Sequence, residues 1–167
     1  MVERRVDIAI LGGGLAGNLL ARQLRRKVPG ASVALFERSE TRGFKVGEST
    51  VEIATHYLIS RVDLSTYVYK NHLPKNGLRY FFDSPQQDAS LTEMSEIGPH
   101  RLPPYPSFQL DRARFEADLI EMNRADGVDV HLPASVSDLR LDAKGHRFTV
   151  TEGDTQSEWG ARWVIDA

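Results

Sequence analysis

The sequence predicts an α/β fold that begins with a strand–helix–strand unit in a parallel sheet. Three observations predict it: a continuous apolar run at residues 6–11, a glycine-rich turn directly after that run, and a second apolar run at residues 32–37. A strand inside a parallel sheet is covered on both faces, so its hydrophobicity is continuous rather than alternating. The whole unit has the roughly thirty residues that such units require.

The helix of this unit is expected between the glycine-rich turn and the dipeptide at residues 29–30, where Pro-Gly ends it. Its apolar stripe is predicted to consist of Leu15, Leu19, Leu20 and Leu24. The opposite face is polar and carries Arg22, Gln23, Arg25, Arg26 and Lys27. Cations in the last turn suit the negative end of the helix dipole.

The turn itself has the G-x-G-x-x-G pattern of a dinucleotide site. We expect Gly12 to make the tight turn, Gly14 to let a pyrophosphate approach the backbone, and Gly17 to let the helix pack close to the strand. An acid that ends the second strand, 20 residues past Gly17, is placed to accept hydrogen bonds from ribose hydroxyls. The predicted cofactor-binding residues here are Gly12, Gly13, Gly14, Ala16, Gly17, Glu37 and Arg38. The alternative is a glycine turn that binds nothing, and the pattern alone does not separate FAD from NAD.

Composition excludes several other classes. The chain has 167 residues and a net charge of −2, without the basic excess that nucleic-acid binding requires. It has no cysteine, and its five histidines are scattered without metal-ligand spacing, so no disulfide framework and no metal site are expected. The apolar stretch at residues 8–20 is interrupted by three glycines, unlike a signal peptide or a membrane span. A cytoplasmic location is therefore expected.

A loop at residues 41–50 follows the second strand and leads into a predicted helix at residues 51–59. Ser49 or Thr50 is expected to cap this helix, with Glu52 completing a capping box. After a dinucleotide-binding unit, the run Gly47-Glu48-Ser49-Thr50 resembles the strap loop of the flavin-dependent halogenases. The resemblance implies that the cofactor is FAD and that Gly47, Glu48 and Ser49 lie near it.

A second match to the same family lies at residues 73–82, where a lysine precedes a short strand. Lys75 falls 27 residues past Glu48, and the resemblance implies that it is the essential catalytic lysine of the halogenases. In that role it holds hypohalous acid or carries it as a chloramine to an aromatic carbon. Desolvation lowers the proton affinity of a lysine and makes its amine nucleophilic. The alternative is an ordinary solvated lysine. The preceding position, commonly aromatic in the tryptophan halogenases, is Pro74.

The middle of the chain, residues 83–107, is polar and proline-rich and is expected to be a long surface loop. A helix then begins near Arg112, with Asp111 as its N-cap and Phe115, Leu119 and Met122 as its buried stripe. A cation in the first turn opposes the helix dipole, and a nearby anion would remove that conflict. Arg112 resembles the arginine that opens this helix and contacts FAD in hydroxylase-like flavoproteins.

The remaining elements complete a Rossmann-like FAD-binding domain of the hydroxylase-like type. A strand is predicted at residues 128–132, an antiparallel β excursion within residues 133–159 with its turn at Lys144-Gly145, and a last strand at residues 161–167. We expect residues 1–167 to be the N-terminal part of a single FAD-binding domain, without the substrate-binding remainder and inactive alone.

The function predicted from the resemblance is that of a flavin-dependent halogenase or close relative. Its partners would be a small aromatic substrate, a halide and a separate flavin reductase, with no nucleic acid and no membrane. One alternative is a hydroxylase-type FAD monooxygenase or reductase, in which Lys75 is incidental. A second alternative is a truncated dinucleotide-binding module without catalysis of its own.

Overall fold

The computed structural model describes residues 4–40 and 43–167. The chain divides into two compact units: unit 1 takes in Met1–Val46 and Arg112–Ala167, and unit 2 takes in Gly47–Asp111. Thr41 and Arg42, which begin the predicted loop, lie outside the described residues. Within the described ranges, no helix has the length and apolar character needed to cross a membrane.

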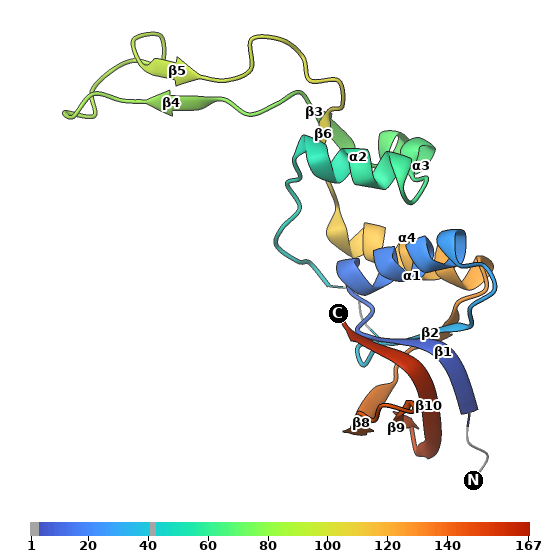
Figure 1. Cartoon of the computed structure of the whole chain (residues 1–167). Coiled ribbons are helices and arrows are strands. Elements are labelled where there is room, and N and C mark those ends of the chain that lie inside the picture. Colours follow the sequence, from blue (N-terminus) through green and yellow to red (C-terminus); the bar gives the residue numbers. More distant parts are fainter. Residues whose placement is uncertain (1–3, 41–42) are drawn as a thin grey trace. The chain divides into compact units, whose positions relative to one another are not determined.

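Unit 1 is built on one six-stranded sheet (Figure 1). Its strands, in spatial order, are β7 (Asp129–His131), β2 (Val33–Phe36), β1 (Arg4–Leu11), β10 (Thr155–Asp166), β9 (His146–Glu152) and β8 (Ser135–Arg140). The first four strands pair in parallel, and β10, β9 and β8 pair antiparallel. The predicted parallel α/β unit and the antiparallel excursion are therefore both confirmed, and they share one mixed sheet.

Helices α1 (Leu15–Lys27) and α4 (Arg112–Ala125) pack together on one face of this sheet (Figure 1). The core on the helix side contains Ile10, Leu35 and Ile120. The core on the other face is aromatic, because Phe36 meets the rings of Phe148 and Trp159 edge to face at centroid distances of 5.5 and 5.0 Å. The continuous apolar runs of β1 and β2 are thus explained by burial on both faces.

The helix surfaces differ from the predicted ones. The leucines of α1 are only half-buried, and its fully buried positions include Asn18, Ala21 and Arg22. Arg22 was expected on the polar face, but Asp126 pairs with it at 2.7 Å and draws it inward. In α4, Phe115 and Leu119 are buried as predicted, while Met122 is only half-buried.

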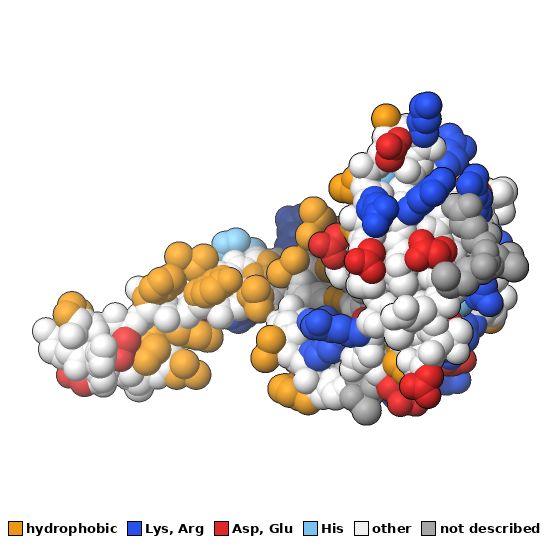
Figure 2. Space-filling view, turned by 90° about the horizontal axis from the view of Figure 1, so that it is seen from below, with side chains coloured by type: hydrophobic (Ala, Val, Ile, Leu, Met, Phe, Trp, Pro, Cys, Tyr) orange, Lys and Arg blue, Asp and Glu red, His pale blue; other side chains and the backbone are white. Residues whose placement is uncertain are grey.

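Unit 2 contains two short helices, α2 (Glu52–Ser60) and α3 (Ser65–Asn71), and two separate two-stranded sheets. One sheet pairs β3 (Leu73–Lys75) with β6 (Ser107–Gln109), and the other pairs β4 (Tyr80–Phe82) with β5 (Ser95–Ile97). Phe108 on β6 is fully buried. The β4–β5 pair instead exposes Tyr80, Phe81, Phe82 and Ile97, and Figure 2 shows hydrophobic side chains along this arm.

Two predictions for unit 2 need correction, and one helix was not predicted. The predicted capping box of α2 is wrong: Val51 is its N-cap residue and no side chain caps it, since the Thr50 hydroxyl is bonded to Phe108 instead. The predicted loop at residues 83–107 contains β5, which pairs with β4. Helix α3 was not predicted from the sequence, and its seven residues offer too short a pattern to recognise.

Candidate functional site: a glycine loop, a cleft and a strap lysine

The first part of the candidate site is the glycine turn at the carboxyl end of β1. Gly12 has a φ of 112°, which disfavours any side chain, and its amide donates to the carbonyl of Phe36 at 2.8 Å. A Cβ atom on Gly12 would lie 2.0 Å from the carbonyl oxygen of Ala167. The turn therefore packs against Ala167, the residue that follows β10, and leaves no room for a side chain at Gly12.

The other two glycines of the pattern differ sharply in their surroundings. A Cβ atom on Gly17 would lie 1.9 Å from the carbonyl oxygen of Gly12, so the first turn of α1 is in close contact with the loop. A Cβ atom on Gly14 would meet nothing within 4 Å. Gly14 is the N-cap residue of α1, which has neither a capping side chain nor an acid in its first turn. That helix end thus presents backbone N–H groups and a positive dipole toward open space, as an anion site requires.

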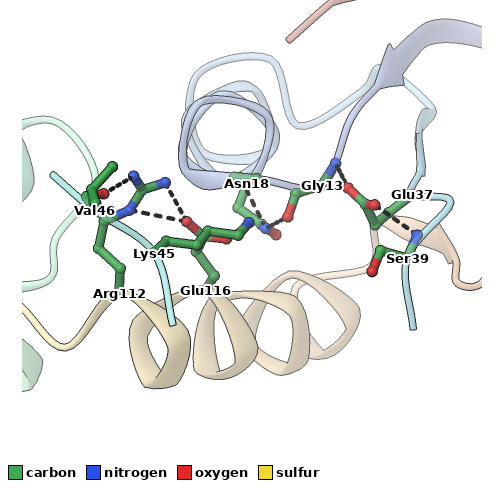
Figure 3. Close-up of polar contacts among 9 residues, drawn as sticks. Gly13, Asn18, Glu37, Ser39, Lys45, Val46, Arg112 and Glu116 are labelled. Carbon is green, nitrogen blue, oxygen red and sulfur yellow. Dashed lines mark hydrogen bonds and ion pairs between the residues drawn. The ribbon is translucent and has the colours of Figure 1, made fainter. Parts of the chain in front are cut away.

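Glu37 fixes the glycine loop from the end of β2. Its Oε2 accepts a hydrogen bond from the Gly13 amide at 2.7 Å, and its Oε1 accepts one from the Ser39 amide at 2.8 Å (Figure 3). The carboxylate therefore couples the glycine loop to the end of the second strand.

These residues line an open cleft of about 670 Å³ in unit 1. The cleft brings together Gly12, Gly14, Glu37 and Arg38 of the predicted set. Ala16 is exposed on the first turn of α1, and Gly13 is buried beneath the loop against the Glu37 side chain. A volume of this size is in the range of small-molecule sites. The residues present therefore fit a dinucleotide that lies across the loop.

Sequence reasoning missed the polar side chain that holds the loop from below. Asn18 is fully buried, and its Nδ2 donates to the carbonyls of Gly13 at 2.6 Å and Gly14 at 3.1 Å (Figure 3). Asn123 of α4 in turn donates to the Asn18 side chain at 3.0 Å. Asn18 therefore fixes the two carbonyl groups of the loop at the first turn of α1. The sequence signal that could have identified this residue is an asparagine directly after the last glycine of the pattern.

A buried carboxylate organises the beginning of α4. Glu116 is completely buried, and its two oxygens pair with the Lys45 ammonium at 2.6 Å and the Arg112 guanidinium at 2.5 Å (Figure 3). Arg112 also donates to the Val46 carbonyl at 2.7 Å. The anion that the sequence required beside Arg112 is thus Glu116, one helical turn along. Lys45, which also lines the cleft, was not predicted.

In unit 2 the strap residues are held as an extra strand beside β6. The Glu48 carbonyl accepts from the Leu110 amide at 2.8 Å, and Thr50 exchanges hydrogen bonds with Phe108 through both its backbone and its hydroxyl. Ser49 forms an isolated antiparallel bridge with Gln109. Gly47 begins this segment with a φ of 81°. The predicted strap is therefore extended backbone rather than a helix cap.

Lys75 lies at the end of β3, on the opposite edge of β6. Its Nζ donates to the Ser49 hydroxyl and approaches the Thr50 carbonyl at 3.4 Å. Lys75 is half-buried and directly opposite Ser107, which is buried. Ser49 and Lys75 are both predicted site residues and are 26 positions apart in the sequence. Unit 2 brings them into contact.

Comparison with known proteins places this geometry in a family. The tryptophan halogenase family model matches residues 7–81. The flavin-dependent halogenase chlA of Dictyostelium discoideum is 36% identical over 133 residues, which are 72% of this chain and 22% of the relative. The chain belongs to the flavin-dependent halogenase family.

Two further similarities cover the chain more completely. The 1H-pyrrole-2-carbonyl-[peptidyl-carrier protein] chlorinase of Pseudomonas fluorescens is 25% identical over 187 aligned positions, covering 100% of this chain and 40% of that enzyme. The structure of the myxobacterial chondrochloren halogenase CndH matches 98% of this chain and 37% of its own with a TM-score of 0.78 and 27% identity. The chain thus spans less than half the length of these relatives.

Proposed function

We propose that unit 1 binds FAD, with the pyrophosphate across the loop at Gly12, Gly13, Gly14, Ala16 and Gly17 and the adenosine ribose at Glu37. The open space at Gly14, together with the uncapped start of α1, carries this proposal. Arg38 and Lys45 line the same cleft, together with the acids Glu37 and Asp166, and Arg38 would lie beside the phosphates. Arg112, although bound to Glu116, remains a candidate flavin contact.

Substituting Gly14 by valine is expected to weaken FAD binding at least tenfold, because the added side chain fills the space a phosphate would occupy. Folding should be nearly unaffected, since Gly14 has a φ of −74° and a Cβ atom there meets nothing. Titration with FAD, followed by flavin fluorescence, gives the affinity, and thermal unfolding checks the fold.

Gly30→Val is the matched control, because Gly30 also has open space around its Cβ position but lies at the far end of α1. Unaltered FAD affinity in Gly14→Val would contradict the pyrophosphate assignment. An equal loss in Gly30→Val would show that the effect is not local.

We further propose that this chain supplies the FAD-binding part of an enzyme that halogenates an aromatic small molecule. When bound, reduced FAD supplies the reaction with oxygen that oxidises a halide, and a separate reductase would deliver the reduced flavin. The contact between Lys75 and Ser49 is the single observation that carries the proposal, because it fixes the position of the amine. Lys75 would then hold the oxidised halogen by a hydrogen bond or as an N–halogen bond, and release it to an electron-rich carbon. Gly47 and Glu48 would adjoin the flavin.

In the enzyme that carries this chain, Lys75→Ala should reduce halogenation by about 10³-fold or more, as loss of a reacting group does. Oxidation of reduced flavin should continue at its ordinary rate, because Lys75 acts after the flavin step. The measurement follows halogenated product and flavin oxidation together, with reductase, FAD, halide and an aromatic substrate. Lys70→Ala, on an exposed lysine of α3, is the control.

Three outcomes separate the alternatives. Full halogenation by Lys75→Ala would remove Lys75 from the chemistry, and oxygen transfer to the substrate with no halogenated product would establish a hydroxylase-type monooxygenase instead. FAD binding without any turnover would favour a cofactor-binding module alone, consistent with our expectation that this chain is inactive by itself. A cytoplasmic setting, where reduced flavin is available, is part of the proposal.

A further inference from the structure

Two asparagine side chains are buried between helices α1 and α4 in unit 1. Asn18 lies in the first turn of α1 and Asn123 lies near the end of α4, and neither is exposed to solvent. Other buried positions of the same helices, such as Ala21 and Ile120, belong to the apolar core. A buried amide group loses its hydrogen bonds to water, so its polar atoms require partners within the protein.

The hydrogen bonds of Asn18 fix the direction of its amide group. Its Nδ2 donates to the Gly13 carbonyl at 2.6 Å and to the Gly14 carbonyl at 3.1 Å, which uses both of its hydrogens (Figure 3). Its Oδ1 accepts a hydrogen bond from the Asn123 Nδ2 at 3.0 Å. A rotation of this amide by about 180° would place Oδ1 against two carbonyl oxygens. The loop and Asn123 together therefore select one orientation of Asn18.

Asn123 is held in one orientation in turn. Its Nδ2 donates to the main-chain carbonyl of Asn18 at 3.0 Å and to the Asn18 side chain at 3.0 Å. Its Oδ1 is buried and accepts no hydrogen bond from the described part of the chain. A buried acceptor of this kind destabilises a folded protein, and a leucine, which has a similar size, would not carry that cost. Stability alone therefore does not account for an asparagine at this position.

The two asparagines act on the peptide groups of the glycine loop. The Gly13 amide is held by the Glu37 carboxylate at 2.7 Å, and the Gly13 carbonyl is held by Asn18 at 2.6 Å. In a trans peptide the carbonyl and the following N–H point in opposite directions, so a fixed Gly13 carbonyl also fixes the direction of the Gly14 N–H. Gly14 lines the cofactor cleft, and a Cβ atom there would meet nothing within 4 Å. Hydrogen bonds rather than side-chain packing therefore hold Gly14 in place.

We infer that Asn18 is a positioning residue for the cofactor and that Asn123 acts through it. Asn18 holds the peptides of Gly13 and Gly14 in one arrangement before a pyrophosphate arrives. Preorganisation of this kind raises affinity, because binding then does not have to order the loop. Asn123 sets the orientation of Asn18 from α4, 105 positions along the chain, and so links that helix to cofactor affinity. This role rests on the proposed binding of FAD by unit 1.

The FAD affinity of the whole chain, measured by titration with flavin fluorescence, gives the first test. Asn18→Ala should raise Kd about tenfold, and Asn123→Leu should raise it about threefold. Because Asn123 acts through Asn18, the double substitution should also raise Kd about tenfold, whereas independent sites would raise it about thirtyfold. A thirtyfold rise of this order would overturn the link between the two asparagines.

Asn71→Ala is the matched control. The Nδ2 of Asn71 also donates to a carbonyl four positions earlier, that of Tyr67 at 2.9 Å, but it does so in α3 of unit 2. This substitution should change the Kd for FAD less than about twofold. A loss of affinity as large as that of Asn18→Ala would show that the effect does not depend on the glycine loop, and would overturn the positioning role.

Thermal unfolding separates positioning from loss of the fold. Asn123→Leu leaves the Asn18 Oδ1 without its donor but removes the buried Asn123 Oδ1 and adds apolar contact. Its Tm should therefore shift by less than about 4 °C while its FAD affinity falls. If Asn18→Ala does not fold, Asn18→Ser takes its place, because a serine hydroxyl reaches the Gly14 carbonyl but not the Gly13 carbonyl.

A measurement without FAD separates the role of Asn18 from the proposed function. In the FAD-free chain, 15N relaxation should show the order parameters of the Gly13 and Gly14 amides falling from about 0.85 toward about 0.6 in Asn18→Ala. Asn123→Leu should show a smaller fall, and the value for Gly30 should not change. Unchanged order parameters at Gly13 and Gly14 would overturn the role of Asn18. A parent chain that binds no FAD would contradict the proposed function, and the order parameters would still decide whether Asn18 holds the loop.

Discussion

Gly17→Ala is expected to lower the free energy of unfolding by about 2–4 kcal/mol. The added methyl group would lie 1.9 Å from the Gly12 carbonyl oxygen and 3.3 Å from the Ile10 side chain. Both the oxygen and the first turn of α1 are backbone, so neither can rotate away. Alanine favours a helix over glycine by up to about 1 kcal/mol, which is too little to offset this overlap. Urea unfolding followed by circular dichroism measures the loss.

The matched control for this prediction is Gly30→Ala. A Cβ atom on Gly30 meets nothing within 4 Å, so the substitution should be neutral or slightly stabilising. FAD affinity should fall together with stability in Gly17→Ala, whereas in Gly14→Val it should fall alone. A Gly17→Ala protein as stable as the parent would mean that α1 can move away from the loop, and would contradict the close contact described above.

Glu116→Gln is the second substitution with a large expected effect, again about 2–4 kcal/mol of unfolding free energy. The carboxylate is completely buried, and it is the shared partner of Lys45 and Arg112. Glutamine keeps the size of the side chain but removes its charge and turns donor hydrogens toward one of the two cations. The loss should stay below that of a fully buried triad, because Lys45 is 38% exposed and can reach water.

Glu121→Gln provides the comparison on the same helix. Glu121 is 68% exposed and pairs with Arg124 at 2.6 Å, so its loss should change stability by less than about 0.5 kcal/mol. Urea unfolding curves give the free energy of unfolding of both variants. The two values can be compared directly if the curves have similar m-values. If the two variants proved equally stable, Glu116 would not be the organising charge of this region.

Much of unit 1 could be predicted because its signals are local. The apolar runs of β1 and β2, the glycine turn between them and the end of α1 near Pro29 are each contained in a few residues. The first part of β10 was missed because residues 155–161 are held by pairing with β9, and their own sequence is polar. Arg22 was misplaced for a related reason, since its partner Asp126 is 104 positions away.

The candidate site divides in the same way. The glycines and Glu37 follow from a spacing pattern whose chemistry is understood, and the cleft does bring Gly12, Gly14 and Glu37 together. Lys45 and Glu116 could not be paired from the sequence, because 71 positions separate them and no local pattern marks either one. The capping box at Ser49 and Thr50 failed because β6, nearly sixty positions further along, competes for the same hydroxyl of Thr50.

The carboxylate of Glu116 has a topological consequence. The chain leaves unit 1 after Val46 and returns at Arg112, and the Arg112 guanidinium bonds the Val46 carbonyl at 2.7 Å while Glu116 holds it in place. The exit and re-entry points therefore lie side by side, as they do where one domain is inserted within another. Gly47–Asp111 is in this sense an inserted segment, and the strands of the sheet in unit 1 pair with one another without any contribution from it.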